Sequence, residues 1–225
     1  MADAPVAEPT AKKGKGCLYK GCFFSMAGML LIMGIVMLKM FSMIKGAYEF
    51  KEEFISEEPM QVAVYTPSAP EKAAVAGKVD ALVSSLSEGT GSQFEFTDRE
   101  INTVIAQSSL MQELGAKANV EIRGQSMTGD VSLPLESIGW ESYFNCEFDV
   151  DVTTDGGMLR LFFNDLKFGG QDVPKPLMNK VNSLIEEAYK HPKVREVMQQ
   201  SDLIEVQDNV LKIVTQAKNG RVNRR

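Results

Sequence analysis

Twenty-three consecutive residues near the N-terminus, 22–44 (CFFSMAGMLLIMGIVMLKMFSMI), contain a single charged side chain, Lys39. At 1.5 Å of rise per residue, about 20 apolar residues cross the ~30 Å hydrocarbon core of a bilayer. The stretch therefore predicts one transmembrane helix. Whatever follows it must fold while attached to a membrane.

A cleaved signal peptide is the main alternative for this stretch. Its apolar core would extend over only ~7–15 residues and end at a cleavage site built from small residues. Here apolar residues resume after Lys39 and continue to Ile44 without such a site, so we expect an uncleaved anchor. Four lysines precede the stretch, whereas only Lys45 and Lys51 follow it closely. Because Lys and Arg accumulate on the cytoplasmic side, we expect a single-pass protein of the plasma (inner) membrane, with its N-terminus cytoplasmic and its C-terminal domain extracytoplasmic.

Six methionines recur within the anchor at intervals of three or four residues and would share one helical face. Such a face fits side chains turned toward lipid, and it also fits a surface for self-association or for a soft metal ion. The sequence leaves the role of this stripe and the oligomeric state open.

The charge balance restricts the partners of the C-terminal region. The whole chain has a net charge of −6, of which the first 45 residues contribute +4, so that residues 46–225 carry −10. A domain this acidic lacks the basic footprint that nucleic-acid phosphates require. We therefore expect membrane lipid, and a second membrane protein as a further candidate partner, but no nucleic acid.

Catalytic and metal-binding patterns are missing from the sequence. Cys146 is the one cysteine beyond the anchor, so no disulfide framework is expected. His191, the sole histidine, stands before Pro192 at a helix break, and zinc has no set of nitrogen and sulfur donors. The run Asp151–Gly156 resembles a calcium loop only faintly, since Phe162 stands where a bidentate Glu is needed. We expect no enzyme activity, no metal and no cofactor.

Composition and periodicity divide the chain into five parts. A basic tail at 1–21 is expected to be disordered, and the transmembrane helix at 22–44 is followed by a juxtamembrane segment and linker at 45–70 that contains three prolines. An extracytoplasmic α+β domain is expected at 71–216 and a second basic tail at 217–225. Within the domain, Val75, Val79 and Leu82 begin an amphipathic pattern that predicts a helix over 71–87.

The rest of the domain alternates between strand and helix patterns. A short strand at 94–96 leads into Thr97 and Glu100, a capping-box pair that starts a helix. Four segments with period-two alternation then predict antiparallel strands with one buried face, a helix follows Pro176, and a last hairpin turns at Asp208 and Asn209. We therefore predict an α+β fold in which a curved antiparallel sheet is packed with amphipathic helices.

Two short motifs resemble a known family. The run 96–102 (FTDREIN) resembles the strand-to-helix opening of the YpmS-like family of membrane-anchored bacterial domains, and 166–174 (LKFGGQDVP) is similar to that family's step from a strand through glycine and proline into a helix. The resemblance covers roughly residues 94–216; the helix at 71–87 and the methionine-rich anchor depart from it. More loosely, such domains are similar to the tubular lipid-binding (TULIP-like) group.

This resemblance implies that the domain binds a lipid or another hydrophobic ligand in an apolar groove. If such a groove exists, its walls would be apolar residues of two predicted helices, for each of which plain core is the simpler interpretation: Ile101, Val104, Ile105, Leu177, Val181, Leu184 and Ile185. A non-enzymatic scaffold or assembly partner for another membrane protein is the alternative function.

Overall fold

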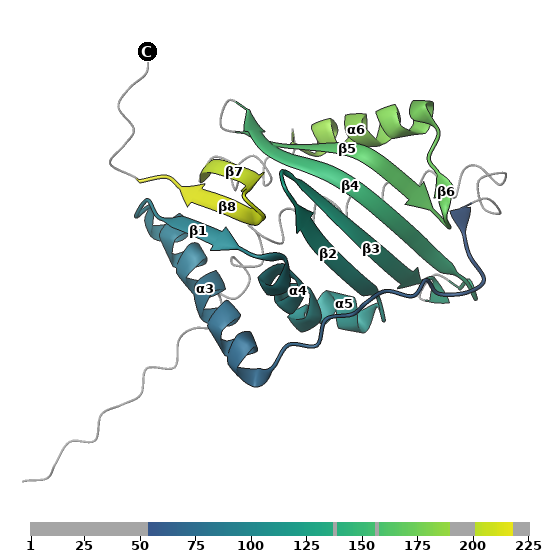
Figure 1. Cartoon of the computed structure of the whole chain (residues 1–225), viewed down its shortest axis with the longest axis horizontal. Coiled ribbons are helices and arrows are strands. Elements are labelled where there is room, and N and C mark those ends of the chain that lie inside the picture. Colours follow the sequence, from purple (N-terminus) through teal and green to yellow (C-terminus); the bar gives the residue numbers. More distant parts are fainter. Residues whose placement is uncertain (1–53, 137–138, 156–157, 190–200, 218–225) are drawn as a thin grey trace, which may run out of the picture.

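The computed structural model describes residues 54–136, 139–155, 158–189 and 201–217 (Figure 1). Within these ranges no helix is both long enough and apolar enough to cross a bilayer. The expected transmembrane helix at 22–44 and the basic tail at 1–21 lie outside the described residues, and so does His191. So does the C-terminal tail beyond Ala217.

The domain is α+β, with a curved antiparallel sheet and helices packed on it, as predicted. The predicted sheet is divided into a five-stranded and a three-stranded sheet, and the helix predicted after Thr97 ends at Gln107 and is followed by a separate short helix. In chain order the elements are α3 (Ala69–Glu88), β1 (Gln93–Phe96), α4 (Asp98–Gln107), α5 (Ser109–Glu113), β2 (Lys117–Arg123), β3 (Ser126–Pro134), β4 (Tyr143–Asp155), β5 (Met158–Phe168), β6 (Gln171–Asp172), α6 (Lys175–Tyr189), β7 (Ser201–Gln207) and β8 (Val210–Thr215).

Local capping signals set the starts of the first two helices. The Thr97 hydroxyl and the Glu100 carboxylate form the capping box predicted for α4. A second capping box, made by Ser68 and Glu71, starts α3, and Gly89 ends that helix in the left-handed conformation (φ 67°). These caps satisfy amide and carbonyl groups that the helix ends would otherwise leave without partners.

The five-stranded sheet has the order β2-β3-β4-β5-β6, and every neighbouring pair is antiparallel. Strand alternation buries one face, on which Val120, Phe148 and Val150 lie. Gly129 is needed there, because a Cβ at this position would lie 2.5 Å from the Phe148 ring and 2.7 Å from the Asn119 carbonyl oxygen. A bulge between Asp149 and Val150 adds to the bend of the sheet.

The three-stranded sheet has the order β1-β8-β7 and joins segments far apart in the chain. Its β7–β8 hairpin turns at Asp208 (φ 53°) and Asn209 (φ 63°), as predicted. Both residues are left-handed, as a tight hairpin turn requires. The Asn209 side chain also accepts a 2.9 Å hydrogen bond from the Gly124 amide of the β2–β3 turn, which ties the two sheets together.

Polar side chains cover the free edges of the sheets. Asn102 of α4 pairs with the backbone of Val120 on the outer edge of β2, and Thr154 of β4 pairs in the same way with the Ile204 backbone of β7. On the edge of β5, α6 supplies the Tyr189 hydroxyl and the Asn182 amide oxygen to two backbone N–H groups. Edges covered in this way are poor templates for pairing with another chain.

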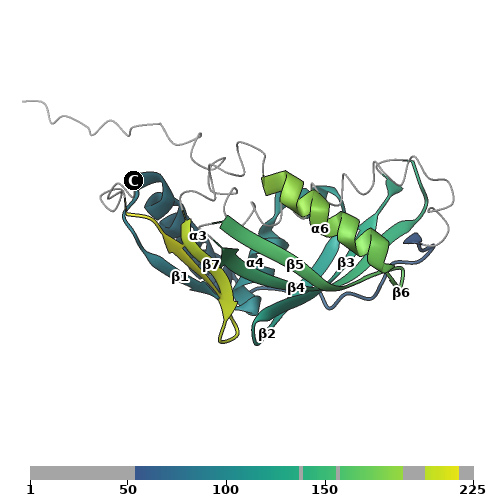
Figure 2. The same ribbon diagram turned by 90° about the horizontal axis from the view of Figure 1, so that it is seen from above.

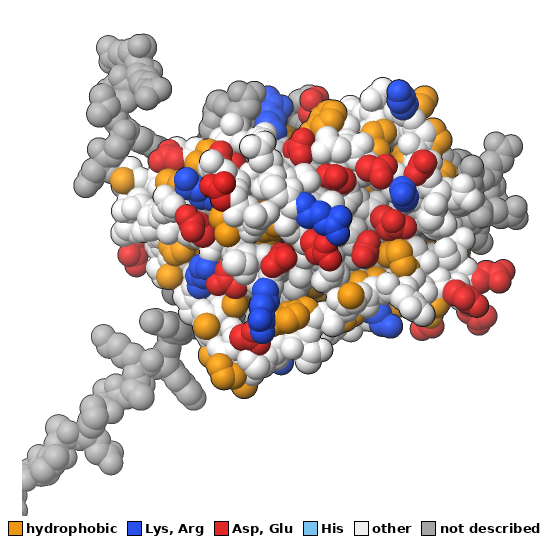
Figure 3. All heavy atoms as spheres, viewed as in Figure 1, with side chains coloured by type: hydrophobic (Ala, Val, Ile, Leu, Met, Phe, Trp, Pro, Cys, Tyr) orange, Lys and Arg blue, Asp and Glu red, His pale blue; other side chains and the backbone are white. Residues whose placement is uncertain are grey.

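Helices α4 and α6 close the two edges of the concave face of the five-stranded sheet. In Figure 2, α6 lies on this face beside β5, and α4 packs on β2. The opposite face of the sheet is exposed, and acidic and basic side chains are interspersed across it (Figure 3). One continuous hydrophobic core joins both helices to the inward side chains of the sheet.

Candidate functional site

The structure places the predicted groove residues in the core, at opposite edges of the sheet. Ile101 and Ile105 of α4 are 4% and 6% exposed against β2, and Val104 is partly buried. Val181 and Ile185 of α6 are each 1% exposed against β5. Leu177 is partly buried, and the Leu184 side chain lies outside the described part of the chain. Side chains of the sheet belong to the same cluster, so both helices contribute to one hydrophobic core.

A cavity of about 260 Å³ lies at the edge of this core, and Ile105 is the predicted residue that lines it. It is bounded by α4, α5, the start of β2 and the extended segment that precedes α3. Its lining consists mainly of apolar atoms, contributed by Val64, Tyr65, Asn102, Ile105, Ala106, Met111, Gln112, Gly115, Ala116, Lys117 and Ala118.

The cavity exists because small residues meet where the chain turns from α5 into β2. Ala106, Gly115, Ala116 and Ala118 all line it and fill little of the space between the two helices and the strand. The turn is held by the Ala116 amide, which donates a 2.9 Å hydrogen bond to the Met111 carbonyl. Gly115 adopts a left-handed conformation there (φ 62°), which glycine tolerates without steric cost.

The opposite wall is formed by residues 54–68, which we call the strap. The strap begins at Phe54, whose ring is 2% exposed and packs edge-on against Phe168 at 5.7 Å between centroids. Ser56 then bridges to Tyr143 at the start of β4. Figure 1 shows the strap (dark blue) running from beside β6 past the ends of the strands to α3. The described part of the expected linker thus lies against the domain.

A buried asparagine holds the middle of the strap. The Asn145 side chain of β4 donates to the Glu58 carbonyl at 2.9 Å and accepts from the Met60 amide at 3.1 Å. Ser132 of β3 completes the set with a 2.8 Å bond to the Asn145 amide oxygen. These bonds replace those that the strap backbone would otherwise make with water, so its course across β3 and β4 is fixed.

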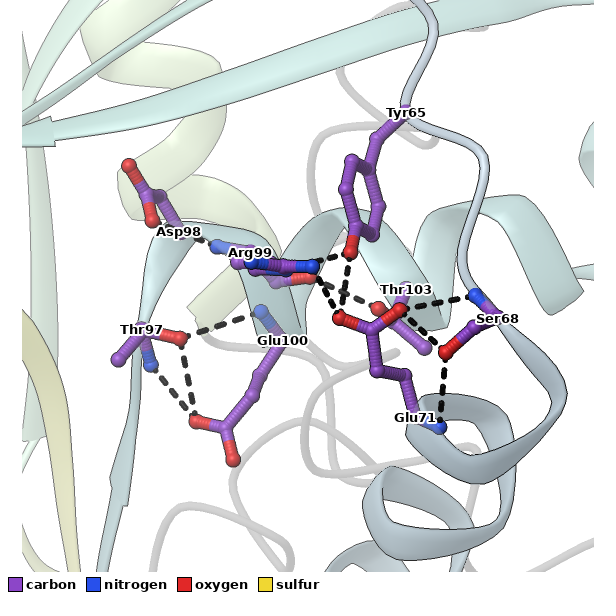
Figure 4. A network of polar contacts seen from close by, with 8 residues as sticks. All are labelled: Tyr65, Ser68, Glu71, Thr97, Asp98, Arg99, Glu100 and Thr103. Carbon is purple, nitrogen blue, oxygen red and sulfur yellow. Dashed lines mark hydrogen bonds and ion pairs between the residues drawn. The ribbon is translucent and has the colours of Figure 1, made fainter.

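Charged side chains hold the end of the strap beside the cavity (Figure 4). The Tyr65 hydroxyl donates to the Glu71 carboxylate at 2.8 Å and accepts from the Arg99 guanidinium at 2.5 Å. Arg99 also forms an ion pair with Glu71. Hydrogen bonds from the Ser68 side chain and backbone, then from Tyr65, lower the pKa of Glu71 to about 2. The cluster joins the strap to the first turns of both α3 and α4.

Among the described residues, metal-ligand clusters and the free Cys146 are the first candidates for a reactive site. No group of three or more His, Cys, Asp or Glu among them is arranged to hold a metal ion. Burial raises the pKa of the Cys146 thiol far above its usual range, so this sulfur is a core group and not a nucleophile. The cavity is lined mainly by apolar surface. The side-chain amide of Asn102, which also lines it, is already hydrogen-bonded to the Val120 backbone.

Comparisons with known proteins returned no matching family model, no matching curated protein and no matching solved structure.

Sequence reasoning missed both the strap and the cavity. The one signal for the strap is the alternation of apolar residues in 60–65 (MQVAVY), which is typical of an extended segment against a surface. The prolines on either side, Pro59 and Pro67, favoured a linker instead. The cavity had no signal of its own, because it depends on where small residues of α4 and β2 meet in space.

Proposed function

We propose that this protein is a single-pass membrane protein whose extracytoplasmic domain binds the apolar chain of a lipid, or a similar hydrophobic ligand, without catalysis. The observation that carries the proposal is the apolar cavity between the strap, α4, α5 and β2. Its rim includes Val64, which is 50% exposed and is one of two exposed large apolar side chains in the described part of the domain, the other being Phe162.

The size of the cavity limits what can enter it. Pockets for drug-sized ligands measure about 300–1,000 Å³, and a volume of about 260 Å³ lies just below that range. It suits a segment of one acyl chain, with the rest of the ligand outside, and not a whole phospholipid.

The position of the strap supports ligand exchange with a nearby bilayer. Nine residues, 45–53, lie between Ile44, the last residue of the proposed anchor, and Phe54, the first described residue of the strap, so the two are ten residue steps apart. A chain of that length spans at most about 33–36 Å when fully extended. The proposed anchor would therefore keep the domain within about 36 Å of the membrane surface, where lipid is the most abundant apolar ligand.

Lipid that copurifies with the full chain tests the proposal. We would extract the protein from membranes in a mild detergent and compare the lipids bound to the wild type and to Ala106→Phe, which fills the cavity from the partly exposed side of α4. The wild type should retain a single-chain or acyl-bearing species that the variant loses. Equal retention by both proteins, or no lipid on either, contradicts the proposal.

A non-enzymatic scaffold or assembly partner is the second candidate. It is favoured by Phe162 of β5, which is 58% exposed and lies opposite Asp151 of β4. Acidic side chains also lie on the exposed face of the five-stranded sheet (Figure 3). Cross-linking of the full chain in membranes, with Phe162→Ser as the variant, tests this function. The scaffold function is supported if a specific membrane protein cross-links to the wild type and not to the variant. It is contradicted if the set of cross-linked proteins is the same for both.

A further inference from the structure

The cavity lining differs in charge from the domain that surrounds it. Residues 46–225 carry a net charge of −10, but the lining contains one basic residue, Lys117, and no acidic residue. Lys117 is exposed and makes no ion pair among the described residues. The residue directly opposite it on β3 is the uncharged Ser132, and Asp130, at the diagonal position on the same face, forms no ion pair with it. The ammonium group at the rim is therefore available to a ligand.

A backbone donor lies beside this lysine. The Val120 N–H and C=O point away from β3, because both bond to the Asn102 side chain. Residues two apart in an antiparallel strand point the same way, and the β2–β3 register shows no shift, so the N–H and C=O of Ala118 also face the open edge. Ala118 lines the cavity. The Ala118 N–H can thus donate to a ligand in the same way as the Val120 N–H donates to the Asn102 side chain.

We propose that the cavity binds a single-chain anionic amphiphile of the fatty-acid type, with its hydrocarbon end among Ile105, Ala106 and Met111 and its carboxylate at Lys117 and the Ala118 amide. This inference rests on the proposed function and adds the charge of the head group to it. A negative head group at this site runs against the field of the acidic domain as a whole, which attracts cations. The net charge of the domain would favour a cationic ligand, so tighter binding of an anion must come from the residues of the cavity itself.

The test uses the full chain in phosphatidylcholine nanodiscs with ¹³C-labelled methionine methyl groups. Met111 lines the cavity, whereas Met127 is 2% exposed in the core and serves as the internal control. Three ten-carbon probes are titrated at pH 7: decanoate, decanol and decyltrimethylammonium. Empty nanodiscs correct for the partition of each probe into the bilayer. The Met111 shift then gives a dissociation constant for each head group.

We expect decanoate to shift Met111 saturably, to leave Met127 in place, and to bind more tightly than decyltrimethylammonium. Lys117→Gln should weaken decanoate binding about threefold, equivalent to about 0.6 kcal/mol and typical of one exposed charge pair, without changing decanol binding. Lys72→Gln, on an exposed lysine that does not line the cavity, should change neither.

Two outcomes overturn the inference in distinguishable ways. If all three probes shift Met111 with similar affinity and Lys117→Gln has no effect, the anionic head group is wrong, while the proposed apolar-chain function stands. If no probe shifts Met111, both the inference and the proposed function are wrong.

Discussion

Replacing Asn102 by alanine removes the side chain that covers the edge of β2 beside the cavity. Asn102 is 7% exposed. Its amide donates to the Val120 carbonyl at 2.7 Å and accepts from the Val120 N–H at 2.9 Å. A net hydrogen bond contributes about 0.5–1.5 kcal/mol, and a buried group left without a partner costs about 1–3 kcal/mol. Because Asn102 also lines the cavity, water can reach part of the vacated space. We therefore expect Asn102→Ala to lower the free energy of unfolding by about 2–3 kcal/mol.

The assay is urea denaturation of the full chain, followed by the fluorescence of Trp140, the single tryptophan, which packs against the core. Hydrogen exchange at the Val120 amide is measured in parallel and should lose its protection in Asn102→Ala. Gln107→Ala is the matched control, since this exposed side chain on the same helix makes one 3.3 Å bond to the Thr103 carbonyl. It should change stability by less than about 0.5 kcal/mol. A loss below about 0.5 kcal/mol in Asn102→Ala, with the Val120 amide still protected, refutes the reasoning.

The remaining predictions concern the strap and the core. The pKa of Glu71 is about 2 in the folded protein, compared with an ordinary value of 4.5. The contribution of Glu71 to stability is therefore complete above pH 4.5 and is lost as the pH falls toward 2. The urea midpoint of the wild type should fall between pH 6 and pH 2.5, and that of Glu71→Gln should fall less. Gly129→Ala forces a Cβ into the space of a phenylalanine ring and a carbonyl oxygen and should cost about 1–3 kcal/mol. Gly77→Ala, where a Cβ meets nothing within 4 Å in the middle of α3, should instead stabilise the fold by about 0.5–1 kcal/mol. Equal effects of the two glycine substitutions in the same denaturation assay contradict the packing argument.

Local chemistry made much of the fold predictable. The Thr97–Glu100 capping box and the turn at Asp208 and Asn209 depend on residues three or fewer positions apart, and both are confirmed. Pairing between distant segments was not predictable in this way. The partner of β1 is β8, with Gln93 opposite Val214, and no short-range pattern indicates that this pair separates from the main sheet.

The candidate site was predicted less well than the fold, for a physical reason. Helical periodicity correctly predicted that Ile101 and Ile105 face the interior. It does not indicate whether an inward face meets a groove or packed side chains. The outcome depends on the sizes of the side chains that meet in the fold. Phe148 and Phe163 pack edge-on on the face between α4 and α6. Beside α5, by contrast, the side chains are small, and a cavity results. The strap resembles a linker in sequence, because Pro59 and Pro67 are a stronger signal than the short apolar alternation of residues 60–65.

Both proposals require that an apolar chain enters the cavity between the strap and β2. The most direct test of this requirement is photo-cross-linking of the full chain in membranes with an acyl probe that carries a diazirine near its methyl end, followed by peptide mapping. We expect adducts on Ile105, Met111 and the Gly115–Ala118 turn, and we expect Ala106→Phe to remove them. Adducts confined to α6 or to the exposed face of the sheet, or adducts at the cavity that Ala106→Phe leaves unchanged, would contradict it.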